Sequence, residues 1–224
     1  MIAENTKRLM DSIREAAVKC GRNAEEIKLV AVSKTFGIDV IREAFDAGLR
    51  DFGENKAQEL RDKASSIGYP VNWHYIGGLQ SNKVKYVVGV ASLIHSVDSM
   101  KLAQEIAARA ERTGVVQPVL LEYKTSGEDT KGGIESKEEL YQIAEFCRDY
   151  KSLLLRGLMT MAPFVDDEAV IRKSFSALRQ IREEMINAGF AMAELSMGMT
   201  GDYEIAIEEG ATILRIGTAI FGSR

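Results

Sequence analysis

Eight short runs of apolar, often β-branched residues recur along the chain. Several are apolar at successive positions, which is typical of strands covered on both faces and not of an open sheet with one wet face. Runs of this kind with helical segments between them predict repeated strand–helix units and a parallel sheet. We expect the strands at 28–34, 50–54, 72–76, 92–97, 118–123, 155–160, 194–197 and 212–217.

The segments between these runs have apolar residues spaced by three and four, with charged residues on the opposite side. They predict outer helices over 38–47, 56–66, 101–112, 137–149 and 168–188. The leading segment 2–20 is also amphipathic and ends at Gly21, so we expect a first helix that covers the gap where an eighth helix would lie. At 224 residues the chain is close to the length of about 250 that is typical of such barrels. We therefore predict an α/β fold: a single-domain TIM-type (β/α)8 barrel spanning residues 1–224.

Charge and composition limit the partners. A formal net charge of −4, with no concentrated basic segment, argues against nucleic acid or an anionic membrane. We find no secretory signal and no apolar run of about 18 residues, so we expect a cytoplasmic protein in which Cys20 and Cys147 stay reduced. His74 and His95 lack metal-ligand spacing, and we predict no metal site; core packing and loop hydrogen bonds explain them better.

Lys34 closes the first run, and Arg215 lies in the last. In a barrel of this type the chemistry gathers at the C-terminal ends of the strands. If Lys34 points inward, side-chain alternation lets Arg215 point into the same barrel mouth. Partial burial there would lower the pKa of Lys34 and free its amine to attack a carbonyl. The alternative is a lysine that turns into solvent or pairs with a carboxylate such as Glu54.

The end of the last run suggests a phosphate-binding site. Gly217 allows the backbone to approach a ligand, and Thr218 begins a short segment whose N–H groups can bind phosphate. Ser196, at the tip of the neighbouring strand, can add a hydroxyl. Asn55 either caps the helix that follows it or reaches the ring of a ligand held by Lys34. The glycine-bearing loop 126–133 does not fit a Walker A pattern, and we expect a mobile loop over the barrel mouth.

Several motifs, in order, resemble those of the pyridoxal phosphate homeostasis proteins over nearly the whole chain. They are Val30-Ala31-Val32-Ser33-Lys34, Phe52-Gly53-Glu54-Asn55, Trp73-His74-Tyr75-Ile76-Gly77, Ile94-His95-Ser96-Val97-Asp98, Gly157-Leu158-Met159-Thr160, Leu195-Ser196-Met197-Gly198-Met199 and Arg215-Ile216-Gly217-Thr218. The resemblance implies a fold type III barrel, similar to the N-terminal domain of alanine racemase, in which Lys34 binds pyridoxal 5′-phosphate (PLP) as a covalent imine. It also implies that Ser196, Gly217 and Thr218 hold the phosphate and that Arg215 faces the pyridine nitrogen. This chain departs from the family pattern at Gly78 and at 122–124.

A permanently charged Arg215 beside the ring nitrogen disfavours the protonated pyridine by like-charge repulsion, which weakens PLP as an electron sink. We also expect the second, β-rich domain of racemases to be missing. The expected function is therefore intracellular PLP homeostasis and delivery to apo PLP-dependent enzymes, by a monomer without substantial catalytic turnover.

Two enzymatic alternatives stay open at this point. One is a PLP-dependent amino-acid racemase, or a related PLP enzyme with an unknown substrate. The other is a Schiff-base aldolase acting on a phosphosugar. Tyr75, Tyr123 and Tyr203 are candidate acids or bases for either, although packing is the commoner role of such tyrosines.

Overall fold

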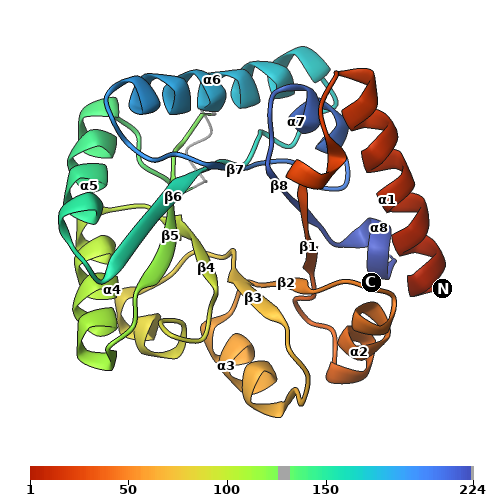
Figure 1. Ribbon diagram of the computed structural model, residues 1–224, viewed down its shortest axis with the longest axis horizontal. Helices are drawn as coiled ribbons and strands as arrows, with labels where there is room; N and C mark the ends of the chain where they lie inside the picture. The colour runs from red at the N-terminus through yellow and green to blue at the C-terminus, as the bar shows by residue number, and fades with distance from the viewer. Residues whose placement is uncertain (126–131, 223–224) are drawn as a thin grey trace.

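The apolar runs become the strands of a closed parallel barrel (Figure 1). The computed structural model describes residues 1–125 and 132–222. Within these ranges, each of eight strands pairs in parallel with the next, and β8 pairs with β1. The strands are β1 (Lys28–Val32), β2 (Asp51–Glu54), β3 (Asn72–Tyr75), β4 (Leu93–Val97), β5 (Gln117–Glu122), β6 (Leu153–Met159), β7 (Glu194–Ser196) and β8 (Ile213–Ile216). The (β/α)8 prediction is confirmed.

The helices surround the barrel, and each predicted one forms within two residues of its expected bounds. They are α1 (Ile2–Lys19), α2 (Ile38–Asp46), α3 (Ala57–Ser66), α4 (Met100–Thr113), α5 (Lys137–Asp149) and α6 (Glu168–Asn187). Local chemistry fixes their ends. Ser99, Ser136 and Asp167 cap α4, α5 and α6 by accepting hydrogen bonds from first-turn amides. Gly114 ends α4 in the left-handed conformation at φ 68°.

The described residues also form four short helical elements: η1 (Ala24–Glu26), η2 (Ser81–Tyr86), α7 (Tyr203–Glu208) and α8 (Thr218–Phe221). Helix α1 packs against α2, α7 and α8, as Figure 1 shows along one side of the barrel. The Asn5 side chain donates a hydrogen bond from Nδ2 to the carbonyl of Ile220 at 3.1 Å. The leading helix therefore closes the outer ring beside the last strand, as predicted.

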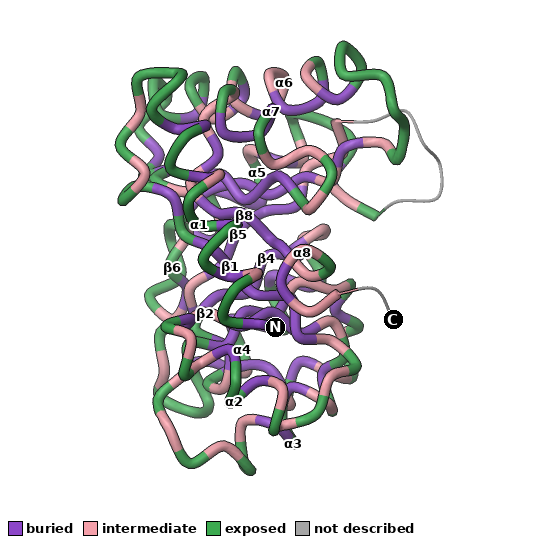
Figure 2. Tube along the Cα trace, turned by 90° about the vertical axis from the view of Figure 1, so that its right-hand side faces the viewer, coloured by how far each residue is buried: buried purple, intermediate pink, exposed green. Residues whose placement is uncertain are grey.

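Two apolar layers hold the barrel together. Side chains inside it form a small cluster of Val30, Leu93, Leu120, Met159 and Ile213. A larger cluster lies between the strands and the helices, so the strands are buried while the outer helix faces are exposed (Figure 2). Val30 and Ile213 therefore point inward, which confirms the predicted parity of β1 and β8.

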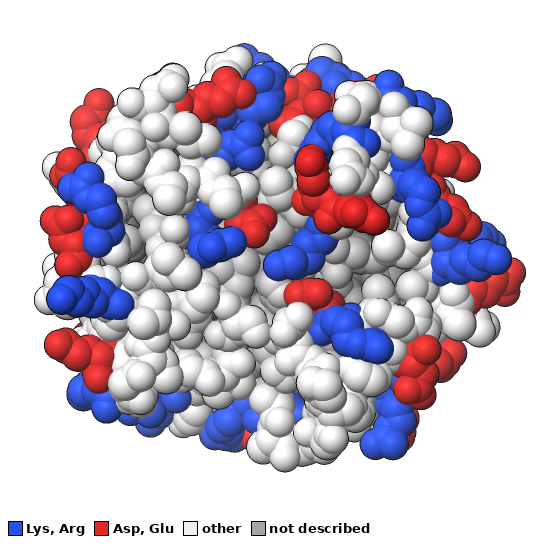
Figure 3. All heavy atoms as spheres, viewed as in Figure 1, with Lys and Arg blue, Asp and Glu red and all other residues white. Residues whose placement is uncertain are grey.

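Charged side chains of both signs lie on the surface of the molecule (Figure 3). On the face seen in Figure 3, basic and acidic side chains are interspersed around the periphery. None of the helices in the described part of the chain has the length and apolar character needed to cross a membrane.

Candidate functional site

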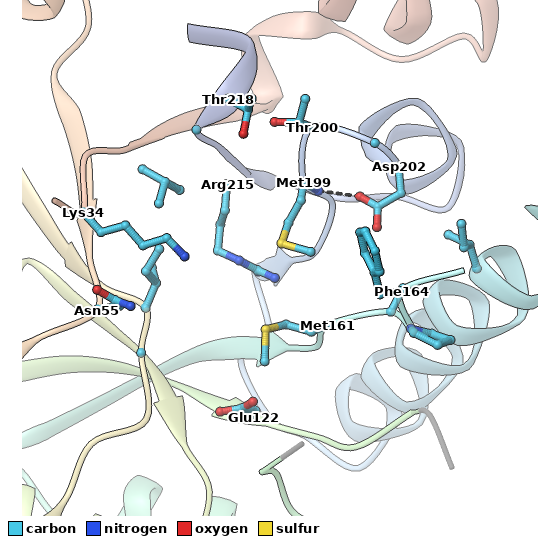
Figure 4. Close-up of a pocket in the computed structure, with 18 of the residues that line it drawn as sticks. Lys34, Asn55, Glu122, Met161, Phe164, Met199, Thr200, Asp202, Arg215 and Thr218 are labelled. Carbon is cyan, nitrogen blue, oxygen red and sulfur yellow. Dashed lines mark hydrogen bonds between the residues drawn. The ribbon is translucent and has the colours of Figure 1, made fainter. Parts of the chain in front are cut away.

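A cavity of about 870 Å³ opens at the C-terminal ends of the strands. Its wall is built from the ends of β1, β5 and β8 and from the loops that follow the other strands. Polar and charged groups on this wall include Lys34, Asn55, Asp98, Glu122, Thr200, Asp202, Arg215 and Thr218. Most of them are shown in Figure 4. The barrel therefore places its reactive side chains where parallel barrels place their active sites.

Lys34 and Arg215 enter this cavity from the C-terminal ends of two adjoining strands, β1 and β8. Strand β1 ends at Val32, two residues earlier than predicted, so Lys34 lies in the turn that follows. Figure 4 shows its side chain extending into the cavity with the amine directed toward Arg215. A Cβ added at Gly217 would lie 3.4 Å from atoms of Val32. Glycine at this position therefore leaves open the space between the ends of β8 and β1. The predicted convergence of the lysine and the arginine is present.

Arg215 is buried and held by two acceptors. Its Nη1 donates to the hydroxyl of Ser196 at 2.6 Å and its Nη2 to the carbonyl of Thr160 at 2.9 Å. Burial lowers the pKa of Arg215 to about 10, an effect that the nearby carboxylates of Glu122 and Asp202 oppose. The guanidinium therefore stays protonated at neutral pH and presents a fixed positive charge to the cavity.

Behind Arg215, a chain of hydrogen bonds crosses the barrel interior. The Ser196 hydroxyl lies 2.8 Å from Nδ1 of His95, and Nε2 of His95 lies 2.9 Å from Nδ1 of His74. Nε2 of His74 lies 2.9 Å from the Asp51 carboxylate, at the start of β2. We call this chain, from Arg215 through Ser196, His95 and His74 to Asp51, the interior relay.

The two ends of the interior relay fix its proton arrangement. Arginine only donates and an ionised aspartate only accepts, so one arrangement satisfies every intervening group. Ser196 donates to His95, His95 donates from Nε2 to His74, and His74 donates from Nε2 to Asp51. Both histidines are neutral in this arrangement. Burial, together with the charge of Arg215, holds the pKa of His95 well below its usual value, which is consistent with a neutral ring.

The structure places the Ser196 side chain behind Arg215. Its hydroxyl is buried between Arg215 and His95, and Ser196 is not among the described residues that line the cavity. Thr200, four residues later, does line it, and Figure 4 draws Thr200 and Thr218 at the same edge. Thr200 is therefore a lining hydroxyl that the sequence reasoning did not assign to the site.

Asn55 lines the cavity and does not cap the helix that follows it. Helix α3 has Lys56 as its N-cap and receives no capping hydrogen bond from a side chain. Instead Asn55 lines the cavity, and its buried Oδ1 has no hydrogen-bond partner within residues 1–125 and 132–222. An unsatisfied buried amide oxygen beside Lys34 is a position where a ligand group can restore the missing hydrogen bond.

Glu122 is a second group that the sequence reasoning did not assign to the site. It ends β5, lies on the cavity wall and is 6% exposed. Burial raises the pKa of this carboxyl to about 7; the charge of Asp98 also raises it, and that of Arg215 lowers it. The signal in the sequence that could have identified Glu122 is the departure from the family pattern at 122–124.

Other sequence candidates lie outside the cavity wall. Tyr75 donates its hydroxyl to backbone carbonyls of Asn55 and Gly78, and Tyr203 donates to Glu204. Neither tyrosine is among the described lining residues, and neither is Tyr123. Residues 126–131 of the expected mouth loop lie outside the described residues. In the described ranges no cluster of three or more potential ligands could hold a metal ion.

Comparison with known proteins agrees with this geometry. The alanine racemase N-terminal domain family matches residues 5–224. The pyridoxal phosphate homeostasis protein of Aquifex aeolicus is 43% identical over 223 residues, covering 99% of this chain and 97% of the relative. The Escherichia coli K12 protein of the same name is 40% identical over 234 residues, covering 100% and 97%.

A solved structure agrees equally over the full length. PipY of Synechococcus elongatus PCC7942, with PLP bound, has a TM-score of 0.86 and 32% identity, covering 99% of this chain and 100% of PipY. The alignments cover nearly whole chains on both sides. The chain therefore belongs to the alanine racemase N-terminal domain family and, within it, to the pyridoxal phosphate homeostasis proteins.

Proposed function

We propose that this protein binds PLP in the cavity through Lys34 and takes part in PLP homeostasis and delivery, without substantial catalytic turnover. One observation carries the proposal: the Lys34 amine and the Arg215 guanidinium enter one cavity whose edge bears the hydroxyls of Thr200 and Thr218. The PLP-bound structure of PipY, a full-length relative, supports it.

The wall of the cavity fits the phosphate end of the cofactor. Thr218 begins α8, and the first amides of a helix have no partner within it. Gly217 adds no side chain, so a ligand can approach the backbone there. We assign phosphate binding to Gly217, Thr218 and Thr200, and we assign Ser196 to the support of Arg215.

The opposite side of the cavity fits a ring and an aldehyde. When bound, PLP supplies an aldehyde that condenses with a primary amine. Lys34 presents that amine, and Asn55 offers an amide oxygen, Oδ1, that has no hydrogen-bond partner within the described residues. Arg215 places a fixed positive charge where the pyridine nitrogen would lie, and like-charge repulsion keeps that nitrogen unprotonated. The site therefore holds the cofactor while weakening its strongest catalytic property.

The test is the visible absorbance of the purified protein before and after borohydride reduction, followed by peptide mass mapping. A pyridoxyl adduct on Lys34 that Lys34→Ala abolishes is the expected result. Lys137→Ala, which changes a half-exposed lysine of α5, is the matched control and should keep the adduct. A protein that cannot be loaded with PLP would overturn the proposal.

Glu122 favours one alternative, a PLP enzyme with an unknown substrate. A carboxyl with a pKa of about 7 on the cavity wall can give or take a proton at neutral pH. The discriminating measurement is exchange of the α-proton of amino acids with deuterated water, in the loaded protein and in Glu122→Gln. Exchange near an ordinary enzyme rate of about 10 s⁻¹, lost in Glu122→Gln, would replace the carrier function with an enzymatic one.

We propose that the protein is a monomer and that it delivers PLP to apo PLP-dependent enzymes. The loaded protein is mixed with an apo-enzyme in the presence of a phosphatase that destroys free PLP. Recovery of enzyme activity under these conditions supports direct transfer, whereas loss of recovery shows that free PLP is the intermediate. Light scattering across a range of concentrations tests the monomer.

A further inference from the structure

We propose that Glu54, Lys63 and Glu59 are positioning residues that fix the backbone on both sides of Lys34 and thereby set where its amine enters the cavity. We call these three residues the acidic clamp. The inference rests on the proposed function of Lys34 and goes beyond it, because none of the three is among the described residues that line the cavity.

Lys63, on α3, is the centre of the acidic clamp. Its Nζ lies 2.7 Å from Oε1 of Glu54 and 2.7 Å from Oε1 of Glu59. It also donates to the backbone carbonyl of Ser33 at 3.0 Å. Three acceptors from separate segments therefore use the three protons of one ammonium group.

The residue before Lys34 is held twice. Ser33 is fully buried; its carbonyl accepts from Lys63, and its hydroxyl donates to Oε1 of Glu54 at 2.6 Å. Since Glu54 ends β2, these bonds tie the exit of β1 to both its neighbouring strand and α3. The sequence alternative in which Glu54 pairs with Lys34 is thus replaced by a pair with Lys63.

The residue after Lys34 is held in a strained conformation. Thr35 has φ 72°, in the left-handed region that a β-branched residue rarely adopts. Its amide donates to Oε1 of Glu59 at 2.8 Å. Such a conformation is energetically costly and persists only where the surroundings over-determine it, most often at functional sites. The acidic clamp supplies that constraint one residue from the reactive amine.

Burying the Glu54 carboxylate costs desolvation free energy, which indicates that the acidic clamp does more than attach α3 to β2. Glu54 is fully buried, and its second oxygen, Oε2, has no hydrogen-bond partner within the described residues. Burial raises the pKa of Glu54, while its bonds with Lys63 and Ser33 act in the opposite direction. An apolar contact of similar size would join α3 to β2 without this desolvation. What an apolar contact cannot do is bind the polar backbone groups of Ser33 and Thr35.

The test measures two quantities separately: the rate at which Lys34 forms an imine with PLP, and the affinity of the cavity for a ligand that cannot form one. Glu59→Gln and the paired change Glu54→Gln with Lys63→Met are the variants; the paired change leaves no unpaired buried charge. Lys137→Met is the matched control, because it removes an exposed lysine–glutamate pair of the same length, 2.7 Å. Pyridoxine 5′-phosphate, which has no aldehyde, reports binding without imine formation.

We expect the paired change to slow the appearance of the imine absorbance about tenfold or more, because small misplacements of reacting groups have effects of this size. Affinity for pyridoxine 5′-phosphate should stay within about threefold of wild type, since the clamp does not line the cavity. Glu59→Gln should show the same split to a smaller degree. Circular dichroism establishes that each variant is folded.

Two results would overturn the inference. Folded variants that form the imine at the wild-type rate would remove the positioning role and leave the proposed function intact. Equal losses of imine formation and of pyridoxine 5′-phosphate affinity would show that the clamp merely maintains the cavity. A wild-type protein that forms no adduct at all would instead reject the proposed function, and the inference with it.

Discussion

Replacing Ser196 with alanine removes the hydroxyl that joins Arg215 to His95, and the cost can be worked out from the structure. Nη1 of Arg215 loses an acceptor at 2.6 Å, and Nδ1 of His95 loses a donor at 2.8 Å. Both groups are buried, and each neutral group left unsatisfied costs about 1–3 kcal/mol, a charged one more. We therefore expect Ser196→Ala to lower the free energy of unfolding by about 3–5 kcal/mol.

The assay is urea unfolding of the cofactor-free protein, followed by circular dichroism. With an m value of about 3 kcal/mol per molar urea, the midpoint should fall by about 1–1.7 M. Thr200→Ala is the matched control. Its hydroxyl belongs to the cavity wall, so unfolding should change by only about 0.5 kcal/mol, while affinity for PLP falls relative to affinity for pyridoxal, which lacks the phosphate.

The opposite pattern would refute the reasoning. If Ser196→Ala unfolds at the wild-type urea concentration and loses its preference for PLP over pyridoxal, then Ser196 binds the phosphate. In that case the hydrogen bonds to Arg215 and His95 would not describe its role in the loaded protein.

Three further perturbations test other parts of the molecule. Lys63→Met leaves Glu54 buried without its cation, so the carboxyl must take up a proton; this costs about 4 kcal/mol at pH 7 and about 1 kcal/mol at pH 5, and urea unfolding at both pH values measures the difference. Glu122 has its pKa raised from 4.5 to about 7, so its stabilising effect is complete below pH 4.5 and is lost as the pH rises to 7. Glu122→Gln should therefore gain about 3 kcal/mol relative to wild type as the pH rises from 4.5 through 7, with no further gain well above that pH. Gly157→Ala would place Cβ 1.9 Å from a backbone oxygen of β7 at φ 155°, and a loss of about 3 kcal/mol or more in thermal unfolding is expected; Gly68→Ala, which meets nothing within 4 Å, is the control.

The architecture was predictable because its physical causes are local. Strands buried on both faces must be apolar at successive positions, and glycines at 48, 189 and 210 adopt positive φ where helices end. The elements η2 and α7 were missed because one or two turns are too short to establish a helical period.

The site was predictable only as far as side-chain alternation continues. Lys34 and Arg215 follow the parity of β1 and β8 into the barrel mouth. Alternation ends after β7, where Gly198 has φ 95° and approaches Ala206 so closely that a Cβ would lie 2.6 Å from its side chain. That turn brings Thr200 to the cavity and leaves Ser196 behind.

The interior relay and the acidic clamp were beyond reach for a different reason. His74 and His95 are 21 residues apart and meet only because β3 and β4 are neighbours. Lys63 reads from the sequence as one more charged residue on an amphipathic helix. Its burial against the end of β1 is set by the packing of α3, which no local pattern encodes.

The arrangement of β1 and β8 has a consequence during synthesis of the chain. Lys34 emerges from the ribosome early, whereas Arg215, Gly217 and Thr218 come at the other end of the barrel sequence. The barrel closes only when β8 pairs with β1 and α8 meets α1. A nascent chain therefore carries Lys34 long before it has the residues that we propose bind the phosphate, and the proposed site is completed only when the barrel closes.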